Sequence, residues 1–173
     1  LGGGTFDISI IRIQGRVYEV LATDGDTFLG GDDMDGILCD RLSERFAQQT
    51  DVNLRHFPLS WYRLRDAAEK AKMELSHAQV CSIFLPRLVG EDSLVTQVTR
   101  EELEEVVSPL VTRSLRIAAR TLQAAGVTTE QIDELVLVGG PTRIPMLRRM
   151  VKEFFDRSPA PGVNPDTAVA EGA

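Results

Sequence analysis

The sequence predicts an α/β fold in which a mixed sheet with packed helices is interrupted by an inserted α+β subdomain. Two alternating apolar segments begin the chain, a short apolar run rich in β-branched residues occurs far downstream, and helical periodicity fills much of the rest. Because the strands on either side of the insertion must return to one sheet, we assign residues 1–31 and 107–173 to the sheet-bearing part. The inserted part covers residues 32–106.

The composition is typical of a soluble globular protein, with 43% apolar and 26% charged residues. No apolar run is long enough to cross a bilayer or resembles a signal peptide, which favours a cytoplasmic setting without membrane contact. The formal net charge of −7 argues against nucleic acid as a partner. Cys39 and Cys81 lack metal-ligand spacing, and we expect both to be buried, reduced thiols.

The chain opens on a glycine-rich turn, Leu1–Asp7, which leads into alternating strand residues. Glycines let backbone N–H groups come close to a phosphate, Thr5 offers a hydroxyl, and Asp7 offers a carboxylate that can hold a cation. A flexible glycine cap on a strand is the alternative. The pairs Gly30–Gly31 and Gly139–Gly140 also follow apolar residues, which favours a phosphate site, although the P-loop and dinucleotide signatures are both absent.

An antiparallel hairpin is predicted from Phe6–Ile13 and Val17–Thr23, joined by a turn at residues 14–16. A helix over about residues 32–49 follows, capped by one of its first two aspartates. The apolar residues expected on the buried side of this helix are Met34, Ile37, Leu38, Leu42 and Phe46.

A second amphipathic helix begins at Leu59 and carries Glu69, Lys72 and Ser76 beside its buried face. Such a stripe can line the edge of a cleft. In the alternative interpretation, Glu69 and Lys72 are solvated surface charges that pair at i,i+3 spacing. The residues expected on the buried face are Leu64, Ala67, Ala68, Ala71 and Leu75.

Two further strands are predicted over residues 79–88 and 94–99. The segment Thr99–Glu102 is a capping box, with a hydroxyl at the N-cap and a carboxylate three residues later. It opens a long helix that runs to Ala125 before a glycine ends it. Pro109 lies inside this helix, and we expect it to kink the helix without ending it.

The apolar run Leu135–Val138 is typical of a strand that is buried on both faces of a sheet. It leads into Gly139–Gly140, where a ligand could meet bare backbone. Arg143 precedes a helix that begins at Pro145, and its guanidinium could either stack on a purine or brace a neighbouring loop. The simplest role of Asp166 is to cap the helix that follows it.

Five segments together resemble the DnaK-type seventy-kilodalton heat-shock chaperones, in that family's order and at its approximate spacing. They are LGGGTFD, GDTFLGGDD, EKAKMELS, VLVGGPTRIP and NPD. The resemblance covers essentially the whole chain, which looks like the second lobe of the ATPase domain. It implies an actin-like, ribonuclease-H-like fold whose two lobes clamp Mg-ATP and hydrolyse it slowly, driving protein folding under heat and other stress.

The resemblance implies ATP or ADP with Mg²⁺ as ligands and leaves room for K⁺. Thr5 and Asp7 would have supporting catalytic roles on the phosphate side, and Asp7 would also hold the metal ion. The other residues implied on the phosphate side are Gly3, Gly4, Gly31 and Asp32. The residues implied on the adenosine side are Glu69, Lys72, Met73, Ser76, Gly139, Gly140, Arg143 and Asp166.

The resemblance also implies partners. These are a GrpE-type nucleotide-exchange factor at the inserted subdomain, a J-domain co-chaperone near the lobe junction, and unfolded clients held by a domain outside this chain. We expect the chain to be an excised piece with negligible ATPase activity of its own, since the first lobe is not in the sequence. Asp32, Met73 and Pro141 depart from the usual family pattern, which suggests a divergent bacterial-type member.

Two other functions stay open at this point. A small-molecule kinase such as a sugar kinase shares the superfold and its phosphate turns, but is not expected to share EKAKMELS or VGGPTRIP. A non-hydrolysing regulatory module would keep nucleotide binding without turnover. Phosphorylation of a sugar by the full-length parent would favour the kinase, and nucleotide binding without hydrolysis would favour the regulatory module.

Overall fold

The computed structural model describes residues 1–171, and the chain divides into two compact units. The first unit consists of Leu1–Gly31 and Ser108–Ala173, and the second of Asp32–Val107. Residues 172 and 173, which end the predicted sheet-bearing part, lie outside the described residues. No helix of the described chain is both long and apolar enough to span a membrane. The assignment of the units to a sheet-bearing part and an inserted subdomain of an ATPase lobe stays a prediction.

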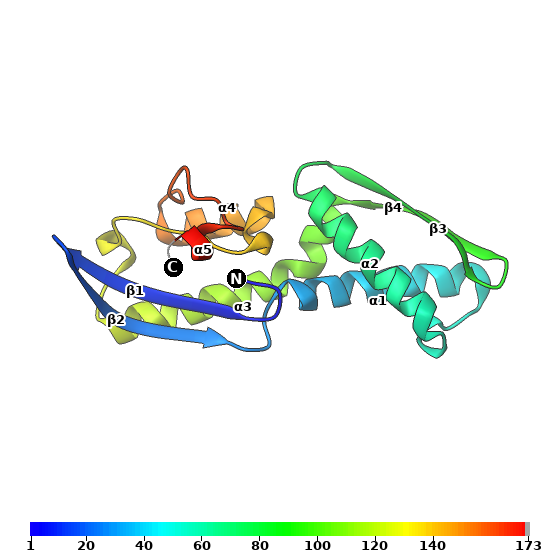
Figure 1. Ribbon diagram of the computed structural model, residues 1–173, viewed down its shortest axis with the longest axis horizontal. Coiled ribbons are helices and arrows are strands. Elements are labelled where there is room, and N and C mark those ends of the chain that lie inside the picture. Colours follow the sequence, from blue (N-terminus) through cyan, green and yellow to red (C-terminus); the bar gives the residue numbers. More distant parts are fainter. Residues whose placement is uncertain (172–173) are drawn as a thin grey trace. The chain divides into compact units, whose positions relative to one another are not determined.

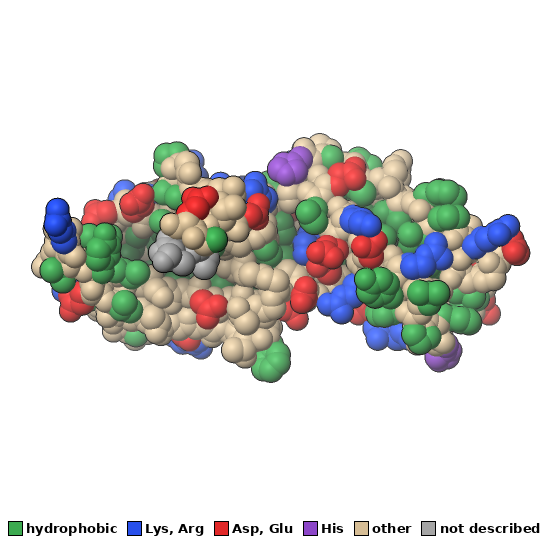
Figure 2. Space-filling view, in the orientation of Figure 1, with side chains coloured by type: hydrophobic (Ala, Val, Ile, Leu, Met, Phe, Trp, Pro, Cys, Tyr) green, Lys and Arg blue, Asp and Glu red, His purple; other side chains and the backbone are tan. Residues whose placement is uncertain are grey.

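The first unit begins with the predicted antiparallel hairpin, formed by β1 (Phe6–Gln14) and β2 (Val17–Asp26) (Figure 1). Gly15 turns the chain with a φ of 62°, a left-handed conformation that glycine adopts without strain. A bulge after Ile10 shifts the strand register. Beyond the bulge, hydrophobic side chains stay at the surface, as the green atoms over the hairpin in Figure 2 show; Tyr18 is 71% exposed.

The long helix α3 (Arg100–Ala125) has the start and end that the sequence predicts. The Thr99 N–H donates to Glu102 Oε2 at 2.9 Å, and the Glu102 N–H donates to Thr99 Oγ1 at 3.1 Å, which completes the capping box. Pro109 lies within the helix without ending it, and Gly126 follows the last turn with a φ of 67°. The expected kink at the proline stays a prediction.

Residues 108–125 of α3 lie along the hairpin of the first unit (Figure 1). Both Nε and Nη2 of Arg120 donate to Asp24 Oδ2, at 3.0 and 2.7 Å, and Arg113 forms an ion pair with Asp26. These pairs attach the end of β2 to the helix. Because the side chain of Asp26 is only 15% exposed, its ion pair is the better shielded of the two.

Helix α4 (Pro145–Phe155) begins with proline at its first position, as predicted. It ends at Asp156, whose φ of 48° is left-handed. The buried side chains of α4 are Met146, Leu147, Val151 and Phe155. The shorter helices of the first unit are η2 (Thr129–Gln131), η3 (Gly140–Arg143) and α5 (Ala168–Glu171).

The strand predicted at Leu135–Val138 is wrong, and so is the mixed sheet that depends on it. Within residues 1–171, each hairpin is a separate two-stranded sheet, and this segment belongs to neither. Its backbone is bonded only at its ends: the Ala160 N–H donates to the Leu135 oxygen at 2.7 Å, and the Leu1 nitrogen donates to the Val138 oxygen at 2.9 Å. Two such contacts do not make a ladder, and Val136 is 55% exposed.

The second unit contains two helices and a hairpin, in the order that the sequence predicts (Figure 1). Helix α1 covers Gly31–Thr50, and α2 covers Pro58–Leu75, with the short η1 (Leu54–His56) between them. The hairpin consists of β3 (Val80–Val89) and β4 (Asp92–Thr99), and leads into α3. The side chains at the centre of this unit are Met34, Leu38, Leu42, Phe46, Leu64, Leu75, Leu94, Val98 and Leu103.

Both cysteines are buried and free, as predicted. Cys39 lies on α1 and Cys81 on β3, and burial raises the pKa of each thiol to about 11. A thiol with such a pKa is almost fully protonated at neutral pH. Neither cysteine is therefore suited to act as a nucleophile or to bind a metal.

Candidate functional site

Three glycine turns that are far apart in the sequence meet in the first unit. They are Leu1–Gly4, Gly30–Gly31 and Gly139–Gly140, called the glycine cluster below. The Gly31 N–H donates to the Gly2 oxygen at 2.9 Å, which joins the second turn to the first. The bond from the Leu1 nitrogen to the Val138 oxygen, 2.9 Å long, brings the third turn to the same place. The sequence predicted the three turns, and the structure brings them together.

Two positions in the glycine cluster have no room for a side chain. Gly139 has a φ of 97°, and a Cβ added to it would lie 1.9 Å from the Leu1 carbonyl oxygen. A Cβ on Gly30 would lie 2.1 Å from the Gly3 oxygen. Both separations are far below any van der Waals contact. The turns therefore pack backbone against backbone at these two positions.

Thr5 and Asp7 lie at the end of the first turn, and both side chains are exposed. Thr5 Oγ1 donates to Asp7 Oδ2 at 3.1 Å. Within residues 1–171, no group of three or more acidic, histidine or cysteine side chains is arranged to hold a metal ion. One carboxylate still fits Mg²⁺, which usually binds one or two protein carboxylates and completes its shell with phosphates and water.

Arg143 is held by two side chains of the segment that precedes α5. Its Nη2 donates to Asp166 Oδ2 at 2.6 Å and to Asn164 Oδ1 at 3.2 Å, while its Nε donates to Asp166 Oδ2 at 3.2 Å. The loop-bracing role is therefore real. It fixes the plane of the guanidinium, and a fixed plane is also what stacking on a purine requires.

Asp166 does not cap a helix, contrary to its simplest predicted role. Helix α5 begins two residues later, at Ala168. The Asp166 carboxylate instead accepts from Arg143, and its other oxygen is the nearest atom, at 3.8 Å, to a Cβ added on Gly140. Its own N–H donates to Asn164 Oδ1 at 3.1 Å. Asp166 thus connects the arginine to the third glycine turn.

In the second unit, Lys72 forms a buried ion pair with Asp35. Lys72 Nζ donates to Asp35 Oδ2 at 2.7 Å, and the two side chains are 11% and 4% exposed. The pair joins α2 to α1. Lys72 is therefore not the solvated surface charge of the alternative interpretation, because its ammonium is buried against an acid 37 residues away in the sequence.

Burial is the main influence on the Asp35 carboxyl, and it raises its pKa. The hydrogen bond and charge of Lys72 act in the opposite direction, while Glu69 and Asp32 raise the pKa further by repulsion. Asp35 Oδ1 is buried and has no hydrogen-bond partner among the described residues. A buried carboxylate oxygen without a partner is costly, so this residue is not placed for local stability.

The other candidate nucleotide-binding residues of the second unit are Glu69, Met73, Ser76 and Asp32. Glu69 is exposed, and Met73 is 61% exposed. Ser76 follows the last turn of α2, where its Oγ donates to the Lys72 oxygen at 3.3 Å. Asp32 is exposed in the first turn of α1. The nucleotide roles predicted for these residues stay predictions.

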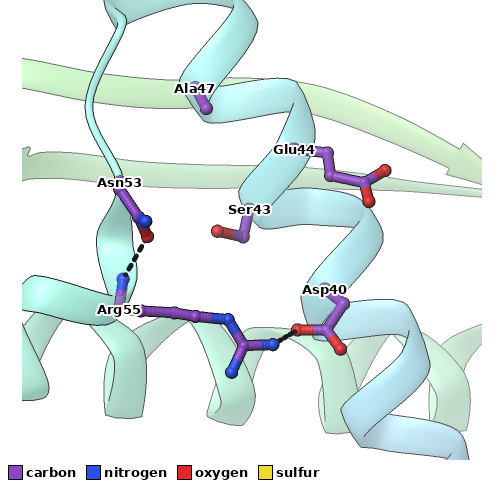
Figure 3. Close-up of a pocket in the computed structure, with 6 residues that line it drawn as sticks. All are labelled: Asp40, Ser43, Glu44, Ala47, Asn53 and Arg55. Carbon is purple, nitrogen blue, oxygen red and sulfur yellow. Dashed lines mark hydrogen bonds and ion pairs between the residues drawn. The ribbon is translucent and has the colours of Figure 1, made fainter.

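A hollow of about 380 Å³ lies on the second unit, away from every predicted site residue (Figure 3). It is lined by Asp40, Ser43, Glu44, Ala47, Asn53 and Arg55. The Arg55 guanidinium pairs with Asp40 and lies 4.7 Å from the centre of the Trp61 ring. The backbone N–H of Arg55 donates to Asn53 Oδ1 at 3.0 Å. Asp40, Asn53 and Arg55 are therefore bonded to one another along one side of the hollow.

Sequence reasoning missed Asn164 and Asp35 as partners of the candidate residues. Asn164 belongs to the NPD segment of the family resemblance, but that pattern does not indicate which residue its side chain contacts. Asp35 follows Met34 within the apolar pattern of α1, and a charged residue at a buried helix position is the signal that could have found it. A buried charge requires a partner.

A comparison with protein families gives one match that spans the whole chain. The family described as "Hsp70 protein" matches residues 1–173. This match includes all three glycine turns and both helices of the second unit.

Proposed function

Because the chain belongs to the Hsp70 family, we propose that it forms the second lobe of the ATP-binding domain of a DnaK-type chaperone. Hsp70 proteins are chaperones that bind ATP or ADP with Mg²⁺. On this proposal, the first unit is the sheet-bearing part of an actin-like ATPase lobe, and the second is its inserted subdomain. The parent protein would assist protein folding under stress in the cytoplasm.

The glycine cluster supports a role on the phosphate side of the nucleotide. Backbone amides near Gly3 and Gly4 can approach phosphate oxygens, since a Cβ at Gly4 would meet nothing within 4 Å. Gly31, whose N–H already donates to the Gly2 oxygen, would border the same site. The exposed Thr5 hydroxyl would touch a phosphate oxygen, and the Asp7 carboxylate would hold Mg²⁺ directly or through its waters. When bound, Mg²⁺ neutralises charge on the phosphates. Asp32 would close over the phosphate side.

Each unit carries residues that the family resemblance implies on the adenosine side. In the first unit, the Arg143 guanidinium would stack on the purine, with Asp166 fixing its plane and bracing the ribose side. Bare backbone at Gly139 and Gly140 would lie beside the base. The remaining contacts in the second unit would come from Glu69, Lys72, Met73 and Ser76.

The observation that carries this proposal is the meeting of the three glycine turns in one backbone cluster. Its test is calorimetric titration of the chain with Mg-ADP. We expect saturable binding that Arg143→Lys weakens by about tenfold, or about 1.4 kcal/mol, since lysine keeps the charge but loses the planar fork. Absence of binding at millimolar nucleotide would count against the proposal.

Membership in the Hsp70 family favours the chaperone over the sugar kinase. The non-hydrolysing module differs from an active ATPase only in turnover, and a phosphate-release assay on the full-length parent distinguishes them. For the 173-residue chain alone, we expect negligible hydrolysis. Robust turnover by this chain, abolished by Thr5→Ala, would contradict that expectation.

The partners follow from the family assignment and stay proposals. A GrpE-type exchange factor would grip the second unit, Asp32–Val107, and a J-domain co-chaperone would bind near the lobe junction. Unfolded clients would bind a domain outside this chain. Co-purification of the exchange factor with the full-length parent, but not with a version lacking the second unit's hairpin, would support the first of these.

A further inference from the structure

The buried ion pair between Asp35 and Lys72 combines a short bond with an unfavourable location. Lys72 Nζ lies 2.7 Å from Asp35 Oδ2, and both side chains are almost fully buried. Buried ion pairs contribute little net stability, because the loss of hydration offsets the attraction between the charges. Asp35 Oδ1, moreover, has no hydrogen-bond partner among residues 1–171. Stability alone therefore gives no reason for an acid at this position.

What the pair does provide is a fixed ammonium group. A lysine side chain has four rotatable bonds, and a ligand that binds a free lysine must first immobilise it. On α2, Lys72 is fixed before any ligand arrives. Its backbone oxygen also accepts from Ser76 Oγ at 3.3 Å, which ties the lysine to the end of the helix.

The same helix offers an exposed lysine–aspartate pair for comparison, formed within α2 instead of between two helices. Lys70 Nζ donates to Asp66 Oδ2 at 2.6 Å, at i,i+4 spacing. There the lysine side chain is 72% exposed and the aspartate 48%, so the pair is screened by water. An exposed pair of this kind restrains its lysine weakly. The Lys70 pair therefore serves as the exposed control for the buried pair.

We propose that Asp35 is a positioning residue, which holds the Lys72 ammonium at the place where a bound nucleoside meets it. The role rests on the proposed function, since it requires that nucleotide contact Lys72. Asp35 itself stays behind the lysine and touches no ligand. Its substitution should therefore affect binding only through Lys72.

The test is a cycle of Mg-ADP affinities measured by calorimetry. The variants are Asp35→Asn, Lys72→Met and the double variant, with Asp66→Asn as the exposed control. We expect Asp35→Asn to weaken ADP binding by about threefold to tenfold, as expected for a rotamer-rich side chain that must be immobilised on binding. In the Lys72→Met background, Asp35→Asn should cause no further loss. Asp66→Asn should bind like the unmodified chain.

Several outcomes would overturn the proposal. Asp35→Asn could weaken ADP binding equally in the unmodified chain and in Lys72→Met. That result would mean that Asp35 acts through the fold and not through Lys72. Unchanged affinity in Asp35→Asn would remove the positioning role while leaving the proposed function intact. No ADP binding by the unmodified chain would remove both. If Asp35→Asn does not fold, as judged by circular dichroism, Asp35→Glu replaces it: it keeps the charge, moves it by one methylene, and should show a smaller loss that also vanishes with Lys72→Met.

Discussion

The Leu1 carbonyl oxygen occupies the space that a side chain on Gly139 would need: only 1.9 Å would separate it from a Cβ. The two residues come from the two separate segments of the first unit. Their contact brings the third glycine turn against the first, and it exists only because Gly139 is a glycine with a φ of 97°.

Gly139→Ala should destabilise the chain strongly. The substitution combines a left-handed backbone with a clash against main-chain atoms, and we expect it to lower the free energy of unfolding by about 3 kcal/mol or more. Gly162 is the control, because its φ is 85° but a Cβ there would meet nothing within 4 Å. Gly162→Ala should cost about 1 kcal/mol. Equal costs for the two variants, measured by urea unfolding, would contradict the close approach of Leu1.

Gly36→Ala should stabilise the chain. Gly36 lies inside α1, and an added Cβ would meet no atom within 4 Å. Alanine has the higher helix propensity, so the free energy of unfolding should rise by about 1 kcal/mol. Gly36→Ser should give a smaller gain, because serine is intermediate in propensity. A loss of stability in Gly36→Ala, seen in the same urea titration, would mean that this part of α1 is packed more tightly than the structure indicates.

The two charges of the buried pair should be strongly coupled in stability. Replacing either residue breaks this buried ion pair, so Asp35→Asn and Lys72→Met should each cost about 3 kcal/mol of the free energy of unfolding. The double variant should lose less than the sum of the two, by about 1 kcal/mol or more. Thermal unfolding of the four proteins gives this difference. Strict additivity would indicate that the two side chains do not interact in solution.

Stability should depend on pH through Glu102. The Thr99 N–H, and to a lesser degree Arg45, lower the pKa of the Glu102 carboxyl from its ordinary value of 4.5. Because the folded-state pKa is the lower one, this stabilisation is present above pH 4.5 and is lost as the pH falls through the folded-state pKa. Glu102→Gln keeps the capping geometry without the charge.

The free energy of unfolding of the unmodified chain should therefore exceed that of Glu102→Gln by about 0.5 kcal/mol at pH 6. The value is small because the pair of Glu102 with Arg45 is partly exposed. The difference should shrink as the pH falls through the folded-state pKa of Glu102 and disappear below it, where the glutamate is as uncharged as the glutamine. Comparing the two proteins at each pH cancels the contributions of other titrating groups to the pH dependence. One of these is Asp24, whose pKa Arg120 also lowers. If the difference in the free energy of unfolding between the two proteins grew on acidification, the pKa of Glu102 could not be lowered in the folded state.

Local sequence patterns predicted most of the elements, because their causes are local. The capping box at Thr99 and the proline at the start of α4 require only neighbouring residues, and both are confirmed. The apolar run Leu135–Val138 predicted a strand that does not form. A strand requires a partner elsewhere in the chain, and no local pattern reports whether one is present.

The candidate site was predictable as a set of residues but not as a set of contacts. Glycine turns can be recognised from their composition alone, whereas the close approach of Gly139 to Leu1 depends on the fold. The spacing of Glu69 and Lys72 suggested a surface pair, yet the lysine is buried against Asp35, which lies on another helix. Arg143 was left between two roles, and only its bonds to Asn164 and Asp166 show that it braces a loop.

The most direct test of the nucleotide site is a Mg-ADP titration followed by residue-resolved NMR. The account predicts saturable shifts centred on Glu69, Lys72, Ser76 and Gly140, while Asn53, which lines the hollow in Figure 3, should not shift. Absence of shifts at millimolar nucleotide, or shifts centred on Asn53 in their place, would contradict the assignment of this chain as a nucleotide-binding lobe.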